Sequence, residues 1–325
     1  MATYKGIKGV KVVTKTSDPT ASEADGTVWF NSTGDALKYA IAGAGTWASG
    51  GALNTPKYGL VGAGTNAAAI MAGGRAPPDL NETETYDGTS WTEVANLNVN
   101  RSFGASASSA PAPTAIVFGG IDGYPTTVHD KTEKWDGTSW TEVNPLNTGR
   151  TYPGGAGASN TNALCFAGNV SPSKQVESWD GTSWSAENSL LGARLEGARG
   201  AGTNTAAICF GGTPGPQANT ESWNGTSWSQ VNDLNLGRSY SAAWGTSTAA
   251  MCGSGNPPLT TNCELWNGTC WSETNNLATA RYDAGAAGVS TGTTNGIAAG
   301  GYPPFLSSSE VWNDPIYAIK TVTVS

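Results

Sequence analysis

The chain has 325 residues, including 44 Gly, 17 Pro, 13 Trp and one His, and its 25 acidic and 17 basic residues give a net charge of −8. This acidic balance excludes the basic footprint of a nucleic-acid-binding protein, and the abundant Trp with few charged residues argues against disorder. No apolar run reaches the ~18 residues of a membrane-spanning helix. Residues 1–8 lack the apolar core of a signal peptide, so we expect synthesis in a cytoplasm without membrane insertion.

Residues 1–39 lie outside the repeat pattern that follows. They begin with four spaced lysines, and residues 27–31, Thr-Val-Trp-Phe-Asn, predict a strand followed by a turn at 32–35. We expect this stretch to be an attachment segment.

A six-residue motif recurs five times from residue 86 onward. Its consensus is aromatic, Asp or Asn, Gly, Thr, Ser or Cys, Trp, and the steps between its final tryptophans are 49, 44, 44 and 43 residues. Each period also holds a Glu two residues before the first aromatic, a Leu six after the Trp, a cation, and an apolar run that ends in small residues. Because Asp-Gly and Asn-Gly favour hairpins, each period predicts four short antiparallel strands, a to d. Four strands per ~40–50 residues are typical of a β-propeller.

The apolar strand ending in Gly-Gly, followed by the aromatic and Trp of the next two strands, resembles the kelch repeat family over roughly residues 40–314. The resemblance implies an all-β, kelch-like propeller. Six Gly-Gly-like sites and six Glu-x-aromatic strands predict six blades. The sixth lacks its own Trp strand, and Trp47 has Leu53 and Lys57 at the expected spacings, so the N-terminal strand is expected to complete the last blade. A seventh blade built partly from residues 5–35 is the less favoured alternative.

The segment 26–31 and the Asp-Gly-Thr-Ser-Trp repeats are similar to proteins of tailed phages, which are usually virion structural or tail-fibre components. That resemblance implies a virion protein that docks on other virion proteins through residues 1–39. Residues 315–325 are expected to hold a C-terminal strand that pairs with residues 7–14 and brings both termini to one attachment surface.

One face of the propeller carries the candidate binding residues. A cation begins each innermost strand, and an aromatic side chain follows it in five of the six repeats, so both sets are expected at one mouth of the channel. The cations are Lys57, Arg101, Arg150, Arg194, Arg238 and Arg281, and the aromatics are Tyr58, Phe103, Tyr152, Tyr240 and Tyr282. Such a ring suits an anionic glycan or an acidic partner. The alternative is that each cation pairs with the Glu of its repeat, and recurrence once per repeat favours this alternative.

The clearest departure from the repeat is the long loop 121–132, which accounts for the 49-residue step. It contains Tyr124 and His129 and is a candidate contact loop. We expect His129 to be exposed there.

The remaining chemistry is expected to be structural. Cys165, Cys209 and Cys252 share a position that Met, Val and Ala occupy in other repeats, which indicates a small core site. A local bridge between Cys263 and Cys270 remains open. No catalytic residue, metal site or cofactor is predicted, because His129 is the only His and no nucleophile elbow is present.

These observations predict a non-enzymatic virion protein, oligomeric or particle-bound, whose propeller binds a host-surface glycan or protein or only its neighbours in the particle. An intracellular bacterial kelch scaffold is the second reading. A carbohydrate-active enzyme with paired carboxylates is the third.

Overall fold

The computed structural model describes residues 12–19, 28–42, 45–123, 127–288, 293, 295–313 and 317–322. The chain forms two compact units: a terminal unit, Met1–Thr46 with Asp314–Ser325, and a ring unit, Trp47–Asn313. The terminal unit therefore extends beyond residue 39, because the strand β3 (Ala36–Ala42) belongs to it. Among the described residues, no helix is long and apolar enough to span a membrane.

The terminal unit is a four-stranded sheet in the order β1 (Val13–Lys15), β2 (Val28–Asn31), β3 and β30 (Tyr317–Thr321). β1 runs parallel to β2, and the other pairs are antiparallel. The C-terminal strand thus pairs with β3, from Lys38 opposite Thr321 to Ala42 opposite Tyr317, and not with residues 7–14 as predicted. Because β3 pairs with β2 along one edge only, its other edge is free to pair with the C-terminal strand. Residues 7–11 lie outside the described residues.

Asp18 organises the described part of the terminal unit. Its carboxylate accepts hydrogen bonds from the indole of Trp29 (3.1 Å), the amide of Asn31 (2.6 Å) and the ammonium of Lys38 (2.6 Å). These bonds lower the pKa of Asp18, the bond from Lys38 most of all. Trp29 is 1% exposed and is the buried centre of the unit's small core, with Ile319 packed against it.

The ring unit contains six four-stranded antiparallel sheets among its described residues. The first sheet consists of β5 (Val61–Gly64), β6 (Ala69–Ala72), β7 (Thr83–Tyr86) and β8 (Trp91–Val94), and the second of β9 (Ala105–Ser106), β10 (Ile116–Phe118), β13 (Thr132–Trp135) and β14 (Trp140–Val143). The third consists of β15 (Gly154–Ser159), β16 (Asn162–Phe166), β17 (Val176–Trp179) and β18 (Trp184–Glu187). The fourth consists of β19 (Arg199–Gly202), β20 (Ala207–Phe210), β21 (Thr220–Trp223) and β22 (Trp228–Val231). The fifth is β23 (Ala242–Gly245), β24 (Ala250–Gly255), β25 (Thr260–Trp266) and β26 (Trp271–Thr274), and the sixth is β27 (Gly285–Gly288), β28 (Asn295–Ala299), β29 (Ser309–Asn313) and β4 (Thr46–Ser49). A two-stranded sheet, β11 (Ile121–Asp122) with β12 (Thr127–Val128), and a 3-10 turn, Ala112–Thr114, complete the described elements of the unit.

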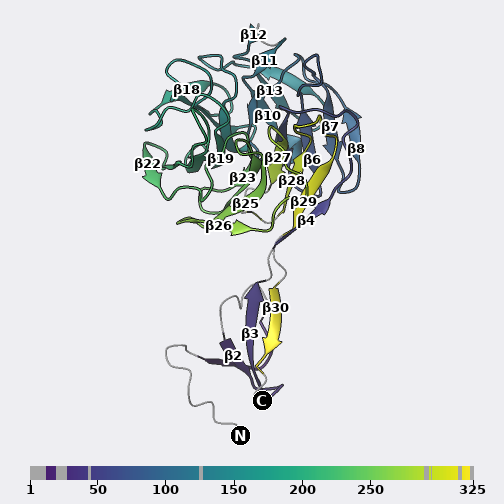
Figure 1. Ribbon diagram of the computed structural model, residues 1–325, viewed down its shortest axis with the longest axis vertical. Coiled ribbons are helices and arrows are strands. Elements are labelled where there is room, and N and C mark those ends of the chain that lie inside the picture. Colours follow the sequence, from purple (N-terminus) through teal and green to yellow (C-terminus); the bar gives the residue numbers. More distant parts are fainter. Residues whose placement is uncertain are drawn as a thin grey trace. The chain divides into compact units, whose positions relative to one another are not determined.

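The innermost strands of the six sheets contact one another in a cycle. β5 contacts β9, and the contacts continue through β15, β19, β23 and β27 back to β5. In Figure 1 the outer strands β8, β18, β22 and β26 lie toward the rim of the ring unit, whereas β19, β23 and β27 lie nearer its centre. The N-terminal strand β4 lies beside β29 and completes the sixth sheet, as the sequence predicted. The fold is therefore all-β and propeller-like.

The repeated motif forms the turn between the third and fourth strands of five sheets. The Asp87 carboxylate accepts the backbone N–H groups of Thr89 and Ser90, both at 2.8 Å, and Gly88 adopts φ +94°. Asp136, Asp180, Asn224 and Asn267 make the same pair of bonds. Asp and Asn interchange here because the turn needs only the side-chain oxygen.

The tryptophan that ends each motif joins neighbouring sheets. The indole N–H groups of Trp140, Trp184 and Trp271 each donate to a threonine hydroxyl of the preceding sheet, Thr83, Thr132 and Thr220, at 2.9–3.0 Å. These three pairs of sheets are thus tied together by a buried, directional contact.

Candidate binding face

The six predicted cations are buried in ion pairs. Lys57, Arg101, Arg150, Arg194, Arg238 and Arg281 pair with Glu84, Glu133, Glu177, Glu221, Glu264 and Glu310, respectively. Arg150 contacts Glu177, and the N–O distances in the other five pairs are 2.8–3.0 Å. Every one of these cationic side chains is at most 1% exposed. These cations therefore do not line an accessible mouth of the ring. The alternative prediction, that each cation pairs with a glutamate of the repeat, describes them.

Each glutamate also accepts a hydrogen bond from the backbone of the linker that contains the cation. The Arg101 guanidinium donates to the carbonyls of Gly119 and Lys131 as well as to Glu133 Oε1, while the backbone N–H of Asn98 donates to Glu133 Oε2 at 2.7 Å. The same backbone bond recurs in all six sheets at 2.7–2.8 Å. The carboxylate therefore fixes the crossover from one sheet to the next, and its charge is balanced within the protein.

The predicted aromatic residues do come together. Tyr58 contacts Phe103, Phe103 stacks on Tyr152, and the contacts continue through Tyr240 and Tyr282. Tyr302, from a loop on the same face, closes the cycle back to Tyr58, and the neighbouring ring centroids are 4.4–6.1 Å apart. With Phe305, which contacts both Tyr58 and Tyr302, these six residues form what we call the aromatic cap.

The aromatic cap is partly open to solvent. Phe305 is 38% exposed, the five tyrosines are half-buried, and Phe103 is buried. Burial raises the pKa values of Tyr152 and Tyr240 above that of free tyrosine, so both phenols are neutral. The cap thus presents uncharged rings whose hydroxyls act as donors.

The backbone beneath the cap is strained in a regular way. Phe103, Tyr152, Tyr240 and Asp283 have φ between +49° and +58°, a region that non-glycine residues rarely adopt. Their N–H groups donate to the carbonyls of Gly59, Phe103, Gly197 and Tyr240, respectively, at 2.8–2.9 Å, and Gly59 donates to Asp283. This relay of hydrogen bonds around the axis holds the strained residues in place, and strain of this kind is concentrated at functional sites.

The second predicted site does not form as expected. Tyr124 lies outside the described residues. His129 is 7% exposed rather than exposed: it directly follows β12, and its backbone N–H donates to the carbonyl of Gly120, the residue before β11. Its Nε2 is buried without a hydrogen-bond partner, and burial lowers its pKa.

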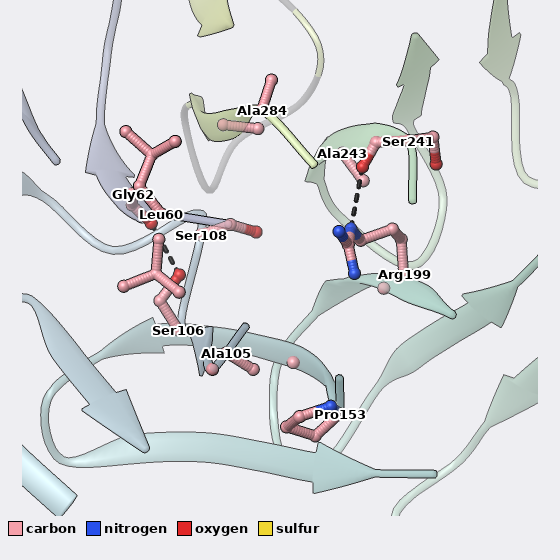
Figure 2. Close-up of a pocket in the computed structure, with 15 residues that line it drawn as sticks. Leu60, Gly62, Ala105, Ser106, Ser108, Pro153, Arg199, Ser241, Ala243 and Ala284 are labelled. Carbon is pink, nitrogen blue, oxygen red and sulfur yellow. Dashed lines mark hydrogen bonds between the residues drawn. The ribbon is translucent and has the colours of Figure 1, made fainter. Parts of the chain in front are cut away.

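One segment bonds across the ends of the inner strands opposite the cap. The segment after β9 supplies Ser108, Ser109 and Ala110, which bond to Gly288, Gly245 and Gly64, the last residues of three other inner strands. A cavity of about 50 Å³ remains within the channel. Figure 2 shows Arg199 on one wall of this cavity and Ser106 on the opposite one.

The sequence analysis missed three charged residues at this site. Arg199 lines the cavity and pairs with Asp283 at 3.1 Å, and Glu196 accepts a hydrogen bond from the Tyr240 hydroxyl at 2.6 Å. Burial raises the pKa of Asp283 to about 7, although Arg199 opposes that shift. The available signal was that charged residues stand where the repeat elsewhere has small or aromatic ones.

The cysteines are free. Cys263 is buried and Cys270 exposed, without a bridge between them, and burial raises the pKa of Cys165 and Cys209 to about 12. Such thiols are inert core groups. Among the described residues, no group of three or more His, Cys, Asp or Glu side chains is placed to hold a metal ion.

Comparisons with known proteins bear on the fold. The chain is similar to a solved structure of YjhT, a known β-propeller, with a TM-score of 0.63 and 15% sequence identity over 83% of this chain and 99% of that chain. No family model matches the sequence, and the search of curated proteins gave no match. The comparisons therefore support a propeller-like fold and do not indicate a function.

Proposed function

We propose that this protein is a non-catalytic binding module, a six-bladed kelch-type propeller that a terminal sheet attaches to a phage particle. The observation that carries the proposal is the division of the chain. Both chain ends belong to the terminal unit, and the 267 residues between them form the other unit. The chain therefore enters and leaves the propeller from two adjacent strands, β3 and β30. This topology suits a module that is displayed from a single attachment point.

The aromatic cap is the surface that we assign to binding. Aromatic side chains are enriched at binding hot spots because they supply large contact areas at low conformational cost. The cations predicted to attract an acidic ligand are already neutralised by buried glutamates. We therefore assign the cap to an uncharged host-surface glycan or a protein, and the terminal unit to other virion proteins.

The test compares full-length variants that change one unit at a time. Phe305→Ser and Tyr302→Ser remove cap surface, and Leu259→Ser, 43% exposed and outside the cap, is the matched control. Asp18→Ala removes the three side-chain bonds that organise the terminal unit. We expect the cap variants to lose binding to host cells but to keep association with particles, and Asp18→Ala to do the reverse.

Two results would contradict the proposal. Full-length protein that binds neither cells nor particles and remains a soluble monomer would favour an intracellular scaffold. Turnover of a glycan would favour an enzyme.

A further inference from the structure

Arg199 stands where the fold does not require a charge. In the pairing register it is the first residue of β19, opposite Phe210. The equivalent residues of the other inner strands are Val61, Ala105, Gly154, Ala242 and Gly285. All five are small or apolar, so packing of the ring is satisfied without a guanidinium at this position.

The guanidinium is only partly used by the protein. Nε donates to the carbonyl of Ser241 (2.8 Å), Nη1 to that of Ala198 (3.3 Å) and Nη2 to Asp283 Oδ1 (3.1 Å). A guanidinium has five N–H groups, so two have no protein acceptor among the described residues. The side chain is 21% exposed, that of Asp283 only 5%. The desolvation of such a pair costs free energy that the attraction between the two charges does not always offset.

We infer that Arg199 and Asp283 form a subsite for two adjacent hydroxyl groups of a neutral saccharide whose ring lies against the aromatic cap. This subsite rests on the proposed function and specifies the ligand of that face. A guanidinium N–H donates to one hydroxyl, and the neighbouring carboxyl accepts from the next. Asp283 and Glu196 disfavour an anionic ligand, and Arg199 disfavours a cation, so an uncharged polyhydroxyl compound fits best.

The size of the cavity limits how the ligand enters. A cavity of about 50 Å³ has room for a few ordered waters or for the hydroxyl groups at one edge of a sugar. We place the rest of the ring against the cap, beside Tyr240 and Tyr282, which flank Asp283. Ser109 and its neighbours bond across the opposite end of the inner strands, so we expect the terminal residue of a glycan chain to enter from the cap side.

The experiment is saturation-transfer NMR on the full-length protein with the methyl glycosides of glucose, galactose, mannose and fucose. N-acetylneuraminic acid and glucuronic acid are the anionic arm. We expect at least one neutral glycoside to bind and the acids not to. Arg199→Met should weaken that binding by about 10-fold or more, the value of a hydrogen bond to a charged group. Asp283→Asn, which keeps the side-chain shape, should weaken it in the same direction.

The control is Lys131→Met. Lys131 is 36% exposed and pairs with Glu142 at 2.9 Å, so the variant also removes a paired cation but one that does not line the cavity. It should leave binding within about twofold. Binding of none of the neutral glycosides, preferred binding of the acids, or equal affinity of Arg199→Met and the unmodified chain would overturn the inference. If Arg199→Met keeps cell binding that Phe305→Ser loses, the subsite is wrong and the proposed function stands.

Discussion

One buried indole lacks the hydrogen bond that the equivalent tryptophans make, and a single substitution should supply it. The indole N–H of Trp228 is buried without a partner. In the preceding sheet, the position held elsewhere by Thr83, Thr132 and Thr220 is occupied by Val176, opposite Phe166 in the register. Val176→Thr places a hydroxyl where three neighbouring interfaces already have one.

The expected gain follows from two opposing contributions. An unsatisfied buried donor costs roughly 1–3 kcal/mol, and a buried hydroxyl costs a similar amount only if it lacks a partner. In Val176→Thr each group satisfies the other, so we expect the free energy of unfolding to rise by about 1 kcal/mol. Val117→Thr, at a site 2% exposed, is the control and should lower it by roughly 1–2 kcal/mol.

The assay is urea denaturation followed by tryptophan fluorescence, with slopes compared to exclude changes in the unfolded state. The reverse substitution, Thr220→Val, leaves the Trp271 N–H without its acceptor and should cost about 1–3 kcal/mol. If Val176→Thr destabilises the protein as much as Val117→Thr does, or Thr220→Val is neutral, the bond does not contribute as argued.

Three further predictions concern charged groups. Glu221→Gln leaves Arg194 buried without its counter-ion, so the free energy of unfolding should fall by about 3–5 kcal/mol in the same denaturation assay; a loss below 1 kcal/mol would count against a structural role. His129 has a lowered pKa, so its contribution to stability is present above about pH 6.5 and is lost as the pH falls; His129→Gln should flatten this dependence in thermal melts. Asp283 has a pKa raised to about 7, so its contribution is full below the pKa of an unfolded Asp and is lost as the pH rises to about 7. Asp283→Asn should remove that decline between about pH 4 and 7, and an unchanged profile would show that Arg199 keeps the carboxyl ionised.

The architecture of the ring unit could be predicted because its signals are local and repeated. The turn at Asp87 needs only an Asx oxygen and a following glycine, and both are visible in every copy of the motif. The strand containing Trp47 was assigned to the last sheet by its spacing to Leu53 and Lys57, and it lies there as β4. This spacing recurs in every repeat because each sheet forms the same contacts.

The site was harder to predict because its residues are far apart in the chain. Arg199 begins β19 and Asp283 lies in the linker before β27, 84 positions away, so no short motif joins them. The pairing of β30 with β3 depends on which sheet edge is free, and the burial of His129 depends on the path of a single irregular loop. None of these follows from periodicity.

The linker into the fourth sheet shows how a repeat separates scaffold from site. It keeps the buried pair of Arg194 and Glu221 that every sheet needs. It departs from the repeat at Leu191, which is 60% exposed where four other linkers have Asn, at Glu196 in place of an aromatic, and at Arg199. The buried residues are constrained by contacts with their own sheet, whereas residues facing solvent or the channel can change without loss of the fold. Departures confined to such positions therefore support the binding surface that we propose, because two of the three meet the aromatic cap or line the cavity.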